Sequence, residues 1–241
     1  KIRTIFNISN ERKNLFNEDE YPFSIEDNII KLKPNLSSKQ KLYLYLLISS
    51  SLNIFNIVDS EITDDFELIS YYCLKYFLTS KSVIKKFGAN SDYTGNTISK
   101  INQLIADLGL KPNEENINDI STKNIKERGL DLVAWLPFKD KIPNMLIFMF
   151  QCACGKNWES KQGETELFSN YMYFNINPIH GMFVPYSMSK TDNRFYQFDR
   201  IKKVLFFDRK RIIEQFENCD FLSDIQSLKI IEKSLSIRIT F

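Results

Sequence analysis

Histidine is almost absent from this chain, since His180 is the only one among 241 residues. Zinc hydrolases, HNH and HD enzymes and Ser-His-Asp hydrolases all need at least one well-placed histidine, and most need several. A lone histidine beside Gly181 is more typical of a structural residue. A hydrolase built from this sequence would therefore use carboxylates and lysine with a hard cation such as Mg²⁺ or Mn²⁺, which oxygen ligands suit.

Cysteine and long apolar runs are also scarce. The four cysteines form no C-x-x-C pair, which argues against a zinc cluster, and nothing suggests a disulfide framework. We therefore expect a reducing, cytoplasmic setting. The longest apolar run, residues 42–48, is far too short to cross a bilayer, and no signal peptide is visible. We expect no membrane partner.

Glycine and proline occur only seven times each, whereas 43% of the residues are hydrophobic, which is ample for a core. The nearly continuous apolar pattern of residues 39–57 predicts a buried helix. A second helix is expected to begin at Ser60, which can cap it. Apolar spacing predicts a third, amphipathic helix over residues 98–108, with Gly109 as its stop.

Two portions of the chain are distinguished by these patterns. Residues 1–58 form a mostly helical N-terminal portion with an edge strand over 2–8, and residues 59–241 form the larger portion. Within the latter we predict helices over 159–171 and 209–218, and strands over 181–187, 204–207 and 235–241.

Two apolar runs, residues 130–135 and 145–150, stand on either side of a linker that contains two prolines and an aspartate. Such runs are typical of strands buried on both faces, and the linker has the composition of a hairpin loop. We therefore predict two adjacent central strands in an α/β fold with a mixed sheet flanked by helices. Their pairing would bring Asp131, Gln151 and Lys156 to one end of the sheet.

This arrangement resembles the PD-(D/E)XK nuclease superfamily, which has the restriction-endonuclease-like fold. In that superfamily an Asp on one strand and a D/E-x-K on the next form a divalent-metal site, and a Gln often replaces the second acid. The resemblance covers residues 60–160 and assigns residues 59–241 to the nuclease core. It implies that Asp131 is the central metal ligand, with Gln151 and the backbone carbonyl of Cys152 as further ligands.

The chain departs from the superfamily pattern at two positions. Gln151 stands where an acid is more common, and Ala153 occupies the position of the lysine. The lysine role would then fall to Lys156, because Gly155 tolerates positive φ and allows a sharp turn back toward the site. Lys161 is the reserve, and we also expect it to contact nucleic acid.

A further acidic ligand has two candidates. Glu67 follows Phe66 on the helix that begins at Ser60, and resembles the Glu that points toward the metal from the first helix of that fold. Glu127 is the last acid before the first core strand. The plainer interpretation of Glu67, a solvated residue on an amphipathic helix, stays open.

Positive charge is concentrated late in the chain. The net charge is only +2, yet residues 190–211 hold eight basic and three acidic residues. Arg209, Lys210 and Arg211 fall in the first turn of a predicted helix, where cations oppose the helix dipole and phosphates bind readily. We predict that they contact nucleic-acid phosphate, although an ordinary charged surface has the same composition.

The resemblance implies a Mg²⁺- or Mn²⁺-dependent endonuclease that hydrolyses DNA with little sequence readout of its own. Members commonly serve in restriction-type or anti-phage defence systems, so other subunits of a defence complex are implied as partners. Two alternatives stay open. One is a catalytically inactive subunit of the same fold that binds nucleic acid or supports assembly, which Gln151 and Ala153 favour. The other is an RNA-directed nuclease.

Overall fold

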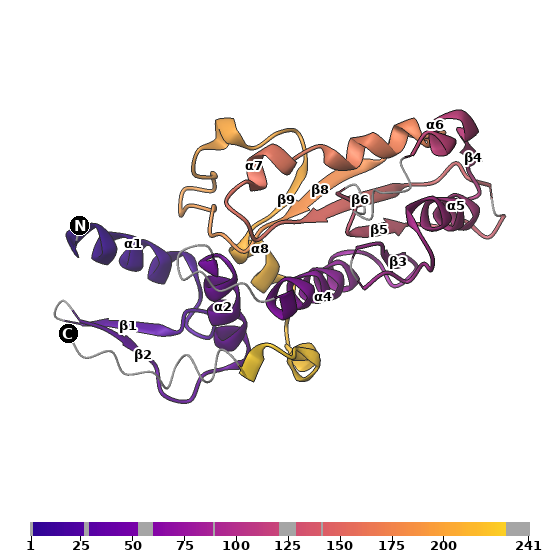
Figure 1. Cartoon of the computed structure of the whole chain (residues 1–241). Helices are drawn as coiled ribbons and strands as arrows, with labels where there is room; N and C mark the ends of the chain where they lie inside the picture. Colours follow the sequence, from indigo (N-terminus) through magenta and orange to yellow (C-terminus); the bar gives the residue numbers. More distant parts are fainter. Residues whose placement is uncertain are drawn as a thin grey trace.

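A five-stranded mixed sheet forms the centre of the computed structural model, which describes residues 2–26, 29–52, 60–88, 90–120, 129–140 and 142–229. The strands are ordered β3 (Val83–Lys86), β5 (Leu132–Trp135), β6 (Ile147–Cys152), β8 (Ile179–Phe183) and β9 (Leu205–Phe207) (Figure 1). The pairs β3–β5 and β5–β6 are antiparallel, and β8 and β9 run parallel to β6. The predicted α/β fold with a mixed central sheet is confirmed.

The two apolar runs do pair as neighbouring strands at the middle of this sheet. Leu132 lies opposite Phe150 and Trp135 opposite Ile147. Alternate residues of β5 enter two different apolar clusters, because successive side chains of a strand point to opposite faces. Both faces are therefore covered, which explains why these strands show no polar alternation.

Helices cover the two faces of the sheet. One face packs against α2 (Ser38–Ser49), α4 (Ser60–Phe77) and α8 (Arg209–Glu214), whose apolar residues share a cluster with Phe150 and Phe207. The other face packs against α5 (Thr97–Leu108) and α6 (Glu114–Asn118). Helix α5 ends as predicted, with Gly109 in the left-handed conformation at φ 66°.

The N-terminal portion contains α1 (Ile2–Leu15), the hairpin β1 (Phe23–Glu26) and β2 (Ile29–Leu32), and α2. The predicted edge strand over residues 2–8 is therefore wrong. Ile2, Ile5 and Ile8 are three residues apart, which is a helical spacing, and all three are exposed on α1. The predicted boundary at residue 58 lies outside the described residues.

The later elements differ from their predicted bounds: the strand expected over 181–187 is β8 (Ile179–Phe183), the strand over 204–207 is β9 (Leu205–Phe207), and the helix over 209–218 ends at Glu214. The helix expected over 159–171 is divided at Gly163, whose φ of 89° separates α7 (Trp158–Lys161) from the 3₁₀ helix η1 (Glu164–Asn170). Two small strands pair elsewhere, β4 (Lys111–Pro112) with β7 (Met172–Tyr173). Two further 3₁₀ helices follow, η2 (Phe198–Arg200) and η3 (Asp220–Asp224). The strand predicted over 235–241 lies outside the described residues.

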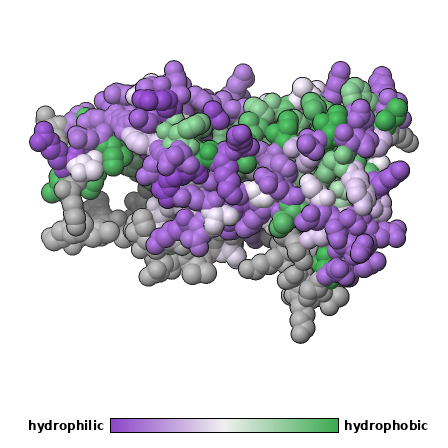
Figure 2. Space-filling model, turned by 90° about the horizontal axis from the view of Figure 1, so that it is seen from above, coloured by the Kyte–Doolittle hydropathy of each residue, from purple (hydrophilic) through white to green (hydrophobic). Residues whose placement is uncertain are grey.

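The surface of the described part is mostly hydrophilic when seen from above, with hydrophobic residues gathered in smaller patches (Figure 2). No helix within the described ranges combines the length and apolar character that a membrane crossing requires.

Candidate active site

Asp131 is held firmly at the end of the sheet, directly before β5. Its backbone N–H donates to the carbonyl of Phe150, at 3.0 Å. Its own carbonyl accepts hydrogen bonds from the N–H groups of Phe87, at 2.7 Å, and Gly88, at 3.2 Å. One carboxylate oxygen, Oδ2, accepts from the backbone N–H of Cys152 at 2.6 Å. The side chain is thus fixed beside the last residues of β6.

Glu67 and Asp131 bring two carboxylates to one point. Helix α4 packs against β3 and β6 and places half-buried Glu67 near Gly88, which follows β3. A Cβ atom added to Gly88 would lie 2.7 Å from Glu67 Oε2 and 3.1 Å from Asp131 Oδ1. The absence of a side chain at Gly88 therefore lets the two acids approach each other.

Gln151 contributes an amide at the same end of the sheet. Its side chain is only 4% exposed, and its Nε2 donates to Glu164 Oε2 at 2.7 Å. Its Oε1 is buried and has no hydrogen-bond partner among the described residues. Buried acceptors are normally satisfied, so this oxygen is suited to a ligand. Glu164 is a site residue that the sequence patterns did not predict, because nothing local marks it as the partner of Gln151.

These side chains line one cavity of about 480 Å³. Its polar wall is formed by Glu67, Asp131, Gln151, Lys161 and Glu164. The structure thus brings Asp131 and Gln151 together with Glu67, which are three of the predicted site residues. Glu127 lies outside the described residues.

The lysine at this cavity is Lys161, the reserve candidate, and not Lys156. Lys156 is exposed in the turn after β6 and is not part of the cavity wall, and Gly155 does not adopt the positive φ that the turn back requires. Instead, α7 begins at Trp158, whose ring is buried against Phe206. One turn later the same helix brings Lys161 to the cavity.

Cys152 and Cys154 are neutral thiols in this site. Burial raises the pKa of both groups, and the nearby carboxylates of Asp131 and Glu67 raise it further. Lys161 lowers the pKa of Cys154 and so opposes part of that shift. The observed contact of Cys152 with Asp131 is made by its N–H, and the metal-ligand role of its carbonyl stays a prediction.

The donor set fits a hard divalent cation. The described residues hold no group of three or more His, Cys, Asp or Glu side chains placed to bind a metal. The cavity instead combines the carboxylates of Glu67 and Asp131 with the amide oxygen of Gln151. Mg²⁺ is commonly held by one or two carboxylates and keeps waters that substrate phosphate can replace. Mn²⁺ suits the same oxygen ligands.

Two of the three predicted phosphate-binding residues are buried. Arg209 is buried, where its Nε donates to the carbonyl of Pro185 at 3.1 Å and its guanidinium lies over the ring of Tyr43 at 4.8 Å. Burial lowers the pKa of Arg209. Lys210 is also buried and forms an ion pair with Glu20 at 2.8 Å. Arg209 is therefore enclosed by partners inside the protein, and the prediction that it contacts phosphate is wrong. Lys210 is engaged by Glu20 but also lines a cavity beside α1, so its contact with phosphate stays a prediction.

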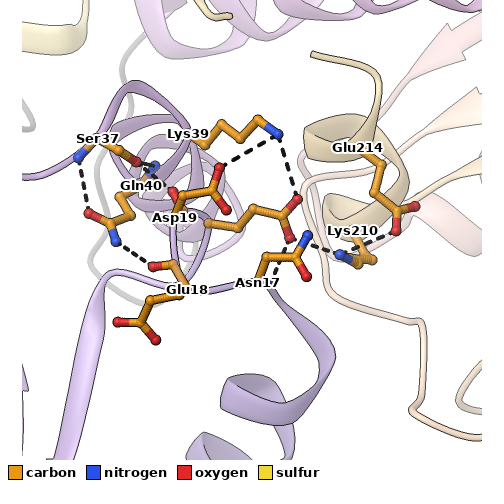
Figure 3. A network of polar contacts seen from close by, with 9 residues as sticks. Asn17, Glu18, Asp19, Ser37, Lys39, Gln40, Lys210 and Glu214 are labelled. Atoms are coloured by element: carbon orange, nitrogen blue, oxygen red, sulfur yellow. Dashed lines mark hydrogen bonds and ion pairs between the residues drawn. The ribbon is translucent and has the colours of Figure 1, made fainter. Parts of the chain in front are cut away.

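Figure 3 shows the network that engages Lys210. Its ammonium lies 3.2 Å from the carboxylate of Glu214, in addition to the contact with Glu20. Lys39 approaches the same region and lies 3.9 Å from Glu20. The third predicted residue, Arg211, is exposed.

Comparisons of the chain with models of known protein families, with curated proteins and with solved structures found no match.

Proposed function

We propose that this protein is a metal-dependent nuclease whose active site is the cavity between α4, β5, β6 and α7. The observation that carries the proposal is the convergence of three carboxylates, an amide and a lysine on that cavity, with Glu67 and Asp131 brought together beside Gly88. The PD-(D/E)XK superfamily uses the same kinds of residue, with acids and an amide at corresponding places on two strands and a helix, but its lysine comes from the strand, whereas Lys161 comes from α7. We extend the α/β fold assignment to the restriction-endonuclease-like fold on the same grounds.

Each residue has a role that follows from its position. Asp131, Glu67 and Gln151 Oε1 would hold the cation, which when bound activates water and neutralises charge on the phosphate. Lys161 supplies a positive charge on the cavity wall, where it stabilises the negative charge that develops on the phosphate oxygens. Glu164 holds the amide of Gln151 so that its oxygen is available to the cation.

Phosphodiester hydrolysis of DNA is the reaction that this residue set supports best. The site has no histidine, so carboxylates and lysine must carry proton transfer and charge stabilisation. RNA presents the same phosphodiester group, so the two substrates are distinguished by experiment.

A second candidate function is favoured by the region after Gln151. Ala153 occupies the position of the superfamily lysine and is buried in an apolar cluster with Trp158 and Phe206. Gln151 is neutral and already bonded to Glu164. An inactive subunit that uses the same fold to bind nucleic acid is consistent with both observations.

Cleavage assays test the two candidates together. The protein is incubated with plasmid DNA, linear single strands and RNA in Mg²⁺, in Mn²⁺ and in EDTA, and metal binding is measured by calorimetry. We expect metal-dependent cleavage that Asp131→Asn abolishes. The matched control is Asp140→Asn, which removes the same charge from an exposed loop. Nucleic-acid binding without cleavage in any metal would favour the inactive subunit, and absence of both would reject both candidates.

A further inference from the structure

A second and larger cavity lies beside the C-terminal end of α1. It has a volume of about 1040 Å³, which is at the upper end of the range for small-molecule sites. It is open on one side and is lined by the end of α1, the segment of residues 189–198 and helix α8. Figure 1 shows where α1 and α8 lie in the fold. Its wall includes Asn14, Asn17, Lys190, Arg194, Phe198 and Arg211. Such a volume accommodates more than one phosphate group.

Arg211 is the cation on this wall that is best placed to meet an anion. Lys190 and Arg194 both pair with Asp192, at 3.5 Å and 2.6 Å. Lys210, which also lines the cavity, pairs with Glu20 at 2.8 Å and with Glu214, another wall residue, at 3.2 Å. Arg211 has no carboxylate partner within the described part of the chain. Its guanidinium lies 4.6 Å above the ring of Phe195, and one of its nitrogens donates to the carbonyl of Phe206 at 2.8 Å. These contacts fix the direction of the charge without neutralising it.

Phe198 presents an aromatic ring to solvent at the same cavity. Its side chain is 70% exposed, and no other aromatic ring contacts it among the residues that the structure describes. Phe195, by contrast, is covered by Arg211 on one side and meets Phe206 edge-on at 5.5 Å. Phe198 is therefore the ring that is available for stacking.

The segment that carries Phe198 is bonded to the helix that carries Lys161. Arg200 Nε donates to Glu159 at 2.7 Å, and its carbonyl accepts from Gln162 at 2.8 Å. The N–H of Lys202 donates to Gln162 at 2.8 Å. The rim of the larger cavity and one wall of the candidate active site are thus joined through α7.

We propose that the larger cavity binds unpaired nucleotides of a nucleic-acid strand. Phe198 stacks against a base, Arg211 contacts phosphate, and Asn14 and Asn17 provide donors and acceptors for base edges. A combination of an exposed aromatic ring and fixed cations is typical of single-strand binding. A duplex does not fit this role, because its bases are already stacked and paired. The inference deepens the proposed nuclease function, on which it rests for the cleavage of the bound strand.

Binding is measured without metal, so that it does not depend on cleavage. Fluorescence anisotropy in EDTA measures the affinity of wild type, Phe198→Ala and Arg211→Gln for labelled single-stranded DNA, single-stranded RNA and duplex DNA. Stacking on one ring corresponds to a loss of roughly five- to a hundredfold in affinity when the ring is removed. We expect a loss in this range for Phe198→Ala on single strands, and Phe198→Trp to restore binding.

Matched controls come from the far end of the sheet. Phe138→Ala removes a ring that is 62% exposed, and Lys139→Ala removes an exposed charge, both from the loop between β5 and β6. We expect both variants to bind like wild type. Thermal unfolding confirms that each variant is folded.

The outcomes separate this inference from the nuclease proposal. Single-strand binding that depends on Phe198 supports the inference even if no metal supports cleavage. The comparison of DNA with RNA shows which sugar the cavity prefers. Equal affinity of Phe198→Ala and wild type for single strands would overturn the inference. Tighter binding of duplex DNA, or of a mononucleotide alone, than of single strands would overturn it as well. Metal-dependent cleavage that persists in that case would leave the nuclease proposal standing.

Discussion

Glu164 holds the amide of Gln151 through a 2.7 Å hydrogen bond from Nε2 to its carboxylate. This contact fixes which end of the amide is the donor, and so assigns the buried, unpartnered acceptor Oε1 to the other side. Gly129 allows the approach, because it adopts a φ of 78° and a Cβ atom there would lie 2.5 Å from Glu164 Oε2. Glu164 thereby orients Gln151, the proposed neutral ligand, without itself needing to contact the proposed metal.

Removal of the Glu164 carboxylate should weaken metal binding at the proposed site without abolishing it. Glu164→Gln offers an amide that can turn either way, so Gln151 is no longer held in one orientation. Substitution of outer-shell partners typically costs 10- to 100-fold in metal affinity or activity. We expect a loss in about this range for Mn²⁺ affinity measured by calorimetry and for the cleavage rate. Glu166→Gln on the same 3₁₀ helix is the control, and an equal loss in both variants would contradict the positioning role.

Gly88 offers a direct test of carboxylate convergence. In Gly88→Ala the new methyl group would meet Glu67 Oε2 and Asp131 Oδ1 at distances that require one of them to move. Because the closest atoms belong to side chains, the fold should persist while the two acids separate. We expect weaker Mn²⁺ binding with little change in unfolding temperature. Gly155→Ala is the matched control, since no atom lies within 4 Å of an added Cβ there.

The centre of the fold could be predicted from the sequence because its signals are local. The uninterrupted apolar runs of β5 and β6 predicted their burial, their pairing and the position of Asp131 near Gln151. Strand β3 was missed, because an edge strand of four residues with two lysines shows no apolar pattern. The helix α1 was missed because its exposed isoleucines suggest a strand as readily as a helix.

The roles of cations could not be predicted, because they depend on partners that are distant in sequence. Arg209 and Lys210 look like an exposed basic cluster, yet Tyr43 and Glu20 take them into the interior. Lys161 reaches the cavity only because Trp158 anchors α7 against the sheet. Sequence periodicity reports burial along one element and carries no information on such pairings.

The buried pair of Lys210 and Glu20 should matter for stability. Glu20 is 1% exposed, so truncation of Lys210 would leave a buried carboxylate without its close ion partner, and only Lys39 would remain, at 3.9 Å. Breaking a buried pair from one side typically costs about 3 kcal/mol or more in unfolding free energy. We expect such a loss for Lys210→Met by urea unfolding, and partial recovery in Glu20→Gln/Lys210→Met. Exposed Lys203→Met should change little, and a similar small effect for Lys210→Met would contradict the structural role.

His180 should make stability depend on pH. Its Nδ1 lies 2.8 Å from Thr165 Oγ1, and burial lowers its pKa, an effect that Glu166 opposes. The unfolded chain therefore takes up a proton at a higher pH than the native protein does. Stability from this group is fully present above the ordinary histidine pKa, about 6.5, and is lost as the pH falls below it. We expect urea midpoints at pH 7.5 and 5.5 to differ less for His180→Gln than for wild type.

Lys161 and Lys156 provide the sharpest comparison within the proposed site. Both lysines follow β6, but only Lys161 lines the cavity, while Lys156 is exposed. A charge that acts on the transition state contributes to the rate and little to substrate affinity. We expect Lys161→Ala to lower the cleavage rate by about 10²- to 10³-fold, the range for loss of one electrostatic contact. Single-turnover cleavage and binding in EDTA separate these two effects.

Lys156→Ala serves as the matched variant, since it removes the same charge five residues away. We expect its cleavage rate to remain within about twofold of wild type, because Lys156 is exposed and does not line the cavity. A larger loss for Lys156→Ala than for Lys161→Ala would assign the catalytic charge to the turn after β6. The guanidinium of Lys161→Arg retains the positive charge with a different geometry. A cleavage rate for Lys161→Arg between those of Lys161→Ala and wild type would therefore show that the reaction requires a positive charge at this position.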